Sequence, residues 1–254
     1  FVVSLLNSQP MGFYPPRQLI FDAEQNHVHF HSLDVQHSDW DYSLIKPGHV
    51  RVGLRSINGF SEQEAPKLID ARKRAGAFRD IEDLVRRTEL SKKTLTRLAT
   101  AGALFALAPD PRQALYSLQG VDFNQQSFFY GTEPLAKPNG RLLRSAPDGQ
   151  LLRSAPDGRE TIPKETAWEN VVREYATKGY SLTDHPIRIL REELGRKEIS
   201  GTPPPFATAE SLKTMKNGAT VRLMGLRSLL QKPPTAKGVC FVSLEDETGI
   251  FNAI

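Results

Sequence analysis

One short stretch decides the fold: Ile57-Asn58-Gly59-Phe60-Ser61, which joins a short apolar element to a helical pattern over residues 62–74. The inward-facing positions of that pattern recur at spacings of three and four, as in an amphipathic helix. A glycine-bearing turn of this kind is typical of a helix-hairpin-helix motif, in which backbone N–H groups at a helix N-terminus reach a phosphate. Gly59 supplies the permissive backbone, and Ser61 stands where such hairpins usually have a second glycine. The alternative is a plain helical turn in a bundle.

A second unit follows at once along the chain. Asp80 and Ser91 are N-cap residues for two further helices, and Gly102 stands at the end of the second one. The apolar positions that should face inward are Ile81, Leu84, Val85, Leu95, Leu98 and Ala99. The sequence therefore predicts a tandem helix-hairpin-helix module.

Cations gather at the beginning of the last of these helices. Lys92, Lys93 and Arg97 fall in its first two turns, where the helix dipole disfavours positive charge. A bound anion such as phosphate would account for them, and a solvated surface is the alternative for each lysine taken singly. For this module we predict these DNA-binding residues: Gly59, Phe60, Ser61, Lys67, Lys92, Lys93 and Arg97.

The composition is that of an ordinary globular protein. The 254 residues are 39% hydrophobic and 24% charged, which favours one or two domains. No apolar run approaches the roughly 18 residues of a membrane-spanning helix, so we expect a soluble chain. The single cysteine, Cys240, excludes an internal disulfide and fits a cytoplasmic location. Because residue 1 is Phe rather than Met and the last residues form a strand-like run, we expect an internal piece of a longer protein.

The formal net charge of +4 is unevenly distributed. Residues 1–50 carry two basic and five acidic side chains, and from this balance we predict that they bind no anion. Residues 51–120 carry 13 basic and 8 acidic side chains. The basic character therefore lies in the predicted hairpin module.

Residues 27–35 alternate between polar and apolar, which predicts a strand with His27, His29 and His31 on one face. Three histidines at this spacing could bind a metal, since side chains two apart on a strand point the same way. We expect a solvated strand face instead, and we assign no metal ligand.

The C-terminal part changes from helices to strands. Helical patterns cover residues 166–194, where His185 precedes a proline and is expected to help a helix begin. From residue 220 the chain alternates, and three strands can be placed. Basic residues on such strands suit an OB-fold, whose groove follows single-stranded nucleic acid while an aromatic side chain stacks on a base. The residues predicted to bind there are Arg222, Arg227, Lys237 and Phe241.

Several long motifs, in one order along the chain, resemble the bacterial C-family DNA polymerases. They occupy residues 6–14, 34–41, the hairpin region from Gly53, residues 235–238 and residues 244–249. The resemblance is strongest to the error-prone, damage-inducible branch related to the alpha subunit of DNA polymerase III. It implies an α+β multidomain fragment from the C-terminal part of such an enzyme, mainly a helical tandem helix-hairpin-helix module followed by the start of an OB-fold β-barrel.

The resemblance also implies a division into segments and a function. Residues 1–50 would end the fingers region, 51–118 form the hairpin module, 119–165 a flexible linker, 166–217 a helical connector and 218–254 a partial OB-fold. The catalytic palm, with metal-binding aspartates for Mg²⁺, would lie upstream, so no catalytic residue and no cofactor is assigned here. We expect the segment to hold duplex and single-stranded DNA for error-prone synthesis across lesions, together with companion translesion proteins. The alternatives are a non-catalytic DNA-binding or repair scaffold and an accessory region of a nuclease or ligase.

The linker contains two features of its own. The octamer of residues 142–149 is repeated at residues 151–158, which predicts a local duplication rich in turns. Gln125-Gln126-Ser127-Phe128-Phe129 resembles the Gln-x-Ser/Asp-Leu-Phe pentapeptide by which polymerases bind the sliding clamp. We predict Gln125, Ser127, Phe128 and Phe129 as clamp-binding residues, with packing of the linker on its own domain as the alternative.

Overall fold

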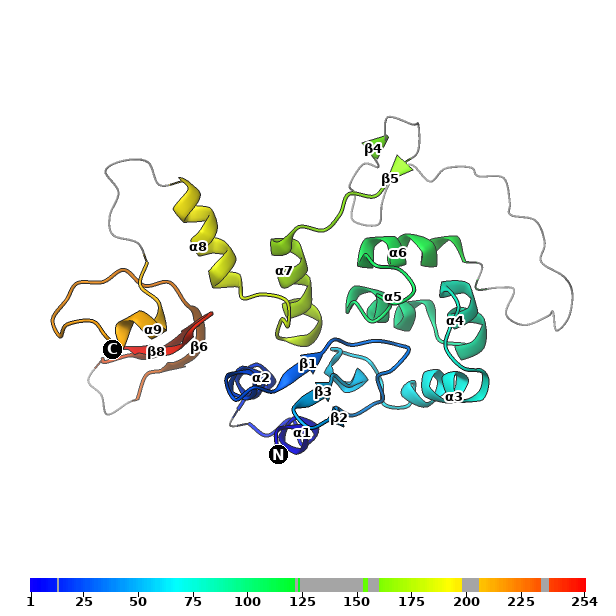
Figure 1. Cartoon of the computed structure of the whole chain (residues 1–254), viewed down its shortest axis with the longest axis horizontal. Coiled ribbons are helices and arrows are strands. Elements are labelled where there is room, and N and C mark those ends of the chain that lie inside the picture. Colours follow the sequence, from blue (N-terminus) through cyan, green and yellow to red (C-terminus); the bar gives the residue numbers. More distant parts are fainter. Residues whose placement is uncertain (13, 122, 124–152, 155–159, 198–205, 234–237) are drawn as a thin grey trace, which may run out of the picture. The chain divides into compact units, whose positions relative to one another are not determined.

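The computed structural model describes the chain apart from residues 13, 122, 124–152, 155–159, 198–205 and 234–237. The chain divides into two compact units. Unit 1 comprises residues 1–166 and 173–182, and unit 2 comprises residues 167–172 and 183–254. The mixture of helices and small sheets agrees with the predicted α+β class (Figure 1).

Unit 1 begins with two helices and a three-stranded sheet. The elements are α1 (Val2–Asn7), α2 (Pro16–Gln25), β1 (His29–His31), β2 (Ser43–Lys46) and β3 (His49–Arg51). β3 is the central strand, parallel to β1 and antiparallel to β2. Val50 on β3 is buried in the core of the unit, which places the opposite face of the sheet toward solvent.

The predicted strand over residues 27–35 is much shorter in the structure. His27 lies in the turn after α2, where its N–H donates to the carbonyl of Glu24 at 3.1 Å and its φ is +62°. A residue in the left-handed region cannot continue a strand, so β1 begins only at His29. The prediction that His27 shares a strand face with His29 and His31 is therefore wrong.

The hairpin module follows the sheet. Its elements are the 3₁₀ turn η1 (Leu54–Ser56) and the helices α3 (Ala65–Ala75), α4 (Ile81–Thr88), α5 (Lys92–Thr100) and α6 (Pro111–Gly120). α3 packs on α4 and α5 packs on α6 (Figure 1). The two predicted N-caps are confirmed, because the side chains of Asp80 and Ser91 accept from the N–H groups of Asp83 and Thr94. The apolar positions predicted to face inward are all buried.

α3 begins three residues later than the predicted helix. The backbone N–H of Glu64 donates to the carbonyl of Ser61 at 3.0 Å, which closes a turn over residues 61–64 before the helix starts. Leu68 is fully buried on the inner side of α3.

Two short strands, β4 (Arg153–Ser154) and β5 (Glu160–Thr161), pair with each other and precede α7 (Ala167–Lys178). The C-terminal half of α7 belongs to unit 1. Just beyond it, the hydroxyls of Tyr180 and Tyr42 lie 2.8 Å apart in the core. Lys178 pairs with Glu174 at 2.7 Å, and burial lowers the pKa of Lys178 although Glu174 opposes this change.

Unit 2 contains α8 (Pro186–Lys197), α9 (Ala209–Leu212) and the strands β6 (Leu226–Gln231), β7 (Phe241–Asp246) and β8 (Gly249–Ala253). The strands form an antiparallel sheet with β7 in the centre, and no closed barrel is present among the described residues. His185 immediately precedes α8, and its ring Nδ1 accepts from the N–H of Ile187 at 3.2 Å. This agrees with the predicted role of His185 in helix initiation.

Candidate nucleic-acid interface

The turn of the first hairpin is held from both sides. Phe60 N–H donates to the carbonyl of Ile57 at 3.1 Å, which closes the turn, and Gly59 inside it has a φ of +73°. Asn58 donates from its backbone N–H to the carbonyl of Thr177 at 2.8 Å and from its side chain to Ala176 at 3.1 Å. The C-terminal end of α7 therefore fixes the turn, and Gly59 stays exposed at its tip.

Arg97 of α5 lies directly against Gly59. A Cβ on Gly59 would stand 3.1 Å from Nη2 and 3.2 Å from the central carbon of the Arg97 guanidinium. A side chain there would require the guanidinium to shift by a few tenths of an ångström, and the left-handed backbone would be strained as well. Beside this contact, the Thr94 hydroxyl of α5 donates to the carboxylate of Glu64. The structure thus brings together two predicted site residues that are far apart in the sequence.

The N-terminus of α5 carries two adjacent lysines. Lys92 and Lys93 are exposed in its first turn, which contains no acidic side chain. The Lys92 ammonium lies over the ring of Phe123, 5.6 Å from its centre. Free N–H groups and cations at one helix end form a site suited to an anion.

The other predicted residues of the module differ in exposure. Lys67 and Ser61 are exposed, and the Ser61 hydroxyl accepts from the N–H of Gln63 at 3.2 Å. Phe60 is only 7% exposed and stacks on Trp40 with ring centres 6.4 Å apart. Phe60 therefore supports the turn from the core, and its side chain presents little surface to a ligand.

A cluster of arginines surrounds Asp83 and was not predicted from the sequence. Arg79, Arg86 and Arg87 all donate to the buried Asp83 carboxylate, at 3.3, 2.8 and 3.0 Å. Burial alone would raise the pKa of Asp83, but hydrogen bonds from the Arg79 backbone and from the three guanidinium groups lower it to about 2. The spacing of these residues, three and four apart along the chain, was the signal that could have revealed the cluster.

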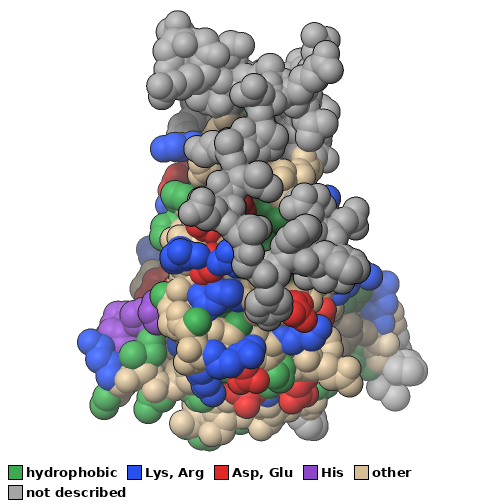
Figure 2. Space-filling view, turned by 90° about the vertical axis from the view of Figure 1, so that its right-hand side faces the viewer, with side chains coloured by type: hydrophobic (Ala, Val, Ile, Leu, Met, Phe, Trp, Pro, Cys, Tyr) green, Lys and Arg blue, Asp and Glu red, His purple; other side chains and the backbone are tan. Residues whose placement is uncertain are grey.

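The three arginines have different roles. Arg87 also donates to the carbonyls of Ala71 and Gly76 and lies over the ring of Phe78, so it ties the end of α3 to α4. The side chains of Arg79 and Arg86 are 73% and 69% exposed. They add positive charge to the surface of the module, and Figure 2 shows several basic side chains on the face that it displays.

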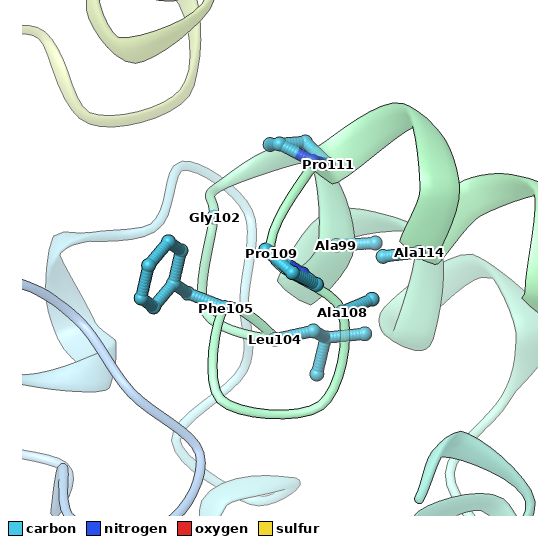
Figure 3. Close-up of a pocket in the computed structure, with 8 residues that line it drawn as sticks. All are labelled: Ala99, Gly102, Leu104, Phe105, Ala108, Pro109, Pro111 and Ala114. Carbon is cyan, nitrogen blue, oxygen red and sulfur yellow. The ribbon is translucent and has the colours of Figure 1, made fainter. Parts of the chain in front are cut away.

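A small pocket in unit 1 has the wrong chemistry for a phosphate. Its lining comes from the end of α5, the following loop and the start of α6, and Figure 3 shows only apolar side chains around it. These are Ala99, Gly102, Leu104, Phe105, Ala108, Pro109, Pro111 and Ala114. The charged N-terminus of α5 and the Gly59 turn are therefore the better candidate for an anion.

The predicted residues of unit 2 are more scattered. The Arg222 guanidinium stacks over Phe206 at 4.3 Å, Arg227 is exposed on β6, and Phe241 is 40% exposed on β7. Lys237 lies outside the described residues, as do Gln125, Ser127, Phe128 and Phe129 of the predicted clamp peptide.

The acidic triplet of residues 245–247 serves the local fold. Asp246 accepts from the N–H groups of Thr248, Gly249 and Ala209, and so stabilises a turn and the start of α9. Arg191 pairs with Asp246 and Glu247 at 3.3 and 2.9 Å. In the described part of the chain, no three His, Cys, Asp or Glu side chains are grouped to hold a metal ion. Each described helix also falls short of what a membrane crossing requires.

Comparison with known proteins identifies the motif and the relatives. The family model described as "Helix-hairpin-helix motif" matches residues 27–114. An error-prone DNA polymerase of Bdellovibrio bacteriovorus is 40% identical over 260 residues, an alignment that includes 100% of this chain. The chain is a homologue of error-prone DNA polymerases. Enzymes with that name from Methylococcus capsulatus and Pseudomonas paraeruginosa are 36% and 34% identical, again across 100% of the chain.

The resemblance seen in the sequence is thus confirmed over the whole chain, and so is the presence of a helix-hairpin-helix motif. The chain spans 23%, 24% and 22% of the length of these three relatives. It therefore aligns with one segment of each of these relatives.

Proposed function

We propose that this chain is the DNA-holding segment of an error-prone DNA-directed DNA polymerase that acts in damage-induced synthesis across lesions. The observation that carries the proposal is the meeting of the Gly59 turn with Arg97, next to the exposed Lys92 and Lys93. A turn without a side chain lets backbone come close to a phosphate, while the cations supply charge-assisted contacts. Such contacts position a duplex without reading its sequence.

Substitution of Arg97 tests this assignment. Arg97→Gln should weaken duplex binding several-fold by fluorescence anisotropy, whatever the sequence of the duplex, because one phosphate contact is lost. Lys213→Gln, an exposed lysine of unit 2, is the matched control and should bind as the unsubstituted chain does. Equal affinities of the Arg97 and Lys213 variants would contradict the proposed grip.

The chemistry of synthesis belongs, in this proposal, to a part of the polymerase outside this chain. Nucleotidyl transfer uses carboxylates around divalent ions, and we expect Mg²⁺ to be held by aspartates upstream of residue 1. The isolated chain, given magnesium, primer-template and nucleotides, should extend no primer. Extension that persists through repurification would place the active site within this segment.

We further propose that unit 2 contributes the start of an OB-fold. Its sheet offers an exposed aromatic side chain, Phe241, together with Arg227, and Arg222 lies just before β6. A single strand could stack a base on the ring while the basic residues, with Lys237, follow the backbone. Phe241→Ala should then weaken single-strand binding and leave duplex binding unchanged.

Clamp binding by Gln125, Ser127, Phe128 and Phe129 is a separate proposal, supported by the sequence of that peptide alone. Changing Phe128 and Phe129 together to Ala should abolish binding to the clamp and leave the melting temperature nearly unchanged. If the two rings instead pack on their own domain, the same change should destabilise the chain by about 3 kcal/mol or more.

The alternative function is a DNA-binding or repair scaffold without polymerase activity. It would use the same hairpin grip, so DNA binding does not separate the two. Primer extension by the longer natural protein does: synthesis that is lost when upstream aspartates are replaced favours the polymerase, and binding without synthesis favours the scaffold.

A further inference from the structure

The solvent face of the β1–β3–β2 sheet gathers histidines and permanent cations. The strand register sets His29 of β1 opposite His49 of β3, and sets His49 opposite Lys46 of β2. In the next row of this face, His31 stands opposite Arg51. Residues in register share a face, so five nitrogen-bearing side chains lie together there. We call His29, His31, Lys46, His49 and Arg51 the histidine face.

The members of the histidine face are in close contact. The rings of His29 and His31 lie 5.1 and 5.3 Å from the ring of His49, centre to centre. Nε2 of His31 and Nδ1 of His49 are 3.0 Å apart and share a hydrogen bond. Figure 2 shows histidine side chains next to basic ones at one edge of the view.

Negative charge near this face is sparse, although residues 1–50 are acidic overall. Asp34 pairs with His37 at 2.8 Å, Asp39 with Arg72 and Asp41 with Arg55. Of the five acidic side chains in residues 1–50, these pairs leave Asp22 and Glu24 of α2, and Glu24 interacts electrostatically with His29. The prediction that residues 1–50 bind no anion was based on their summed charge. In the folded chain, three of the five acidic side chains are paired with other residues, so that sum does not describe the charge of the sheet face.

The surroundings of His49 favour its neutral form. Burial lowers the pKa of His49 from its ordinary value, and Lys46, His29 and His31 lower it further. Each of these neighbours repels a proton on the ring, because each is or can become a cation. A polyanion lying across the face would reverse that balance and would favour protonation.

We infer that the histidine face is a second contact for the phosphodiester backbone of DNA, with an affinity that rises as the pH falls. Lys46 and Arg51 supply attraction at neutral pH, and each imidazole that takes up a proton adds one positive charge. Side chains two apart on one strand are about 7 Å apart, so the two rows of the face meet successive phosphates of a chain that carries one charge per nucleotide. The inference rests on the proposed function in that DNA is taken as the ligand.

The test measures duplex affinity of the full chain at constant ionic strength, at about pH 7.5 and about pH 5.5, where ordinary histidines change charge. The unsubstituted chain should bind about tenfold more tightly at the lower pH, as two or three added charges permit. His29→Gln/His31→Gln/His49→Gln should bind about equally at both values. His37→Gln, an exposed histidine outside the face, should keep the full pH dependence.

Two further measurements separate the possible outcomes. Lys92→Gln/Lys93→Gln should weaken duplex binding at both pH values but keep the pH dependence. This variant therefore tests the hairpin contact independently of the histidine face. If the triple variant does not fold, NMR titration of the unsubstituted chain replaces it, and DNA should raise the pKa of His49. An affinity independent of pH, a triple variant that keeps the dependence, or histidine pKa values unmoved by DNA would overturn the inference.

Discussion

The hairpin module and the C-terminal sheet use apolar side chains in opposite ways. In the module, Leu68, Leu84 and Leu95 are each 0% exposed, whereas on the sheet Leu229 and Ile250 remain 47% and 42% exposed. The buried side chains of the module belong to a core that extends through unit 1. The described part of the sheet leaves apolar side chains exposed to solvent. The comparison shows that the hairpin module supports the Gly59 turn and its cations from a closed core, whereas the C-terminal sheet presents apolar side chains to solvent.

The largest expected effect is a loss of stability when a core leucine of the module is truncated. Leu95→Ala should lower the free energy of unfolding by about 3 kcal/mol, because it leaves a cavity in a fully buried site. Leu229→Ala on β6 is the matched control and should cost well under about 1 kcal/mol, since its side chain already meets solvent. Chemical denaturation of both variants measures the difference. Equal losses would show that the sheet is packed as tightly as the module.

The Asp83 cluster provides the next largest effect. Asp83→Asn should destabilise the module by about 2 kcal/mol or more, because it weakens three arginine contacts to a buried acceptor. The neighbouring exposed Glu82→Gln should change stability by less than about 0.5 kcal/mol. Urea unfolding of the two variants provides the measurement.

The same carboxylate predicts how stability depends on pH. Its pKa is lowered in the folded state, to about 2, so its contribution is complete above the unfolded-state value near 4. The contribution is lost as the pH falls through about 2. The gap between the unsubstituted chain and Asp83→Asn should therefore close under strong acid. A gap that stays constant down to that pH would contradict the lowered pKa.

The local part of the module was predictable from the sequence. Asp80 and Ser91 cap their helices, and Gly59 takes the left-handed conformation that its turn requires. Such features depend on a few neighbouring residues, which is why a pattern can reveal them.

The arrangement of the site depends on contacts that no local pattern contains. Asn58 bonds to Thr177, Tyr42 meets Tyr180, and Arg97 meets Gly59 only after the chain has folded back. The histidine face shows the same limit: alternation predicted His27 in the group, but a turn removed it and a parallel strand brought in His49.

The smallest expected effect is a difference in duplex binding between substitutions of two glycines, one in each unit. Gly59 and Gly218 have φ values of +73° and +82°, so Ala at either position should cost about 1 kcal/mol of stability. A Cβ at Gly59 would meet Arg97, whereas one at Gly218 of unit 2 would meet nothing within 4 Å. Only Gly59→Ala should therefore weaken duplex binding in an anisotropy assay. Equal duplex binding by the two variants would show that the Gly59 turn is not part of the DNA interface.

The salt dependence of duplex affinity tests the phosphate grip most directly. Between about 50 and about 200 mM salt, the affinity should fall steeply, with a log–log slope of about −0.9 for each phosphate contacted. Lys92→Gln/Lys93→Gln should reduce the magnitude of that slope by up to about 2, whereas Lys213→Gln/Lys216→Gln, with the same loss of charge on unit 2, should leave it unchanged. An affinity that is the same at both salt concentrations, or a slope that the first pair does not alter, would contradict the account.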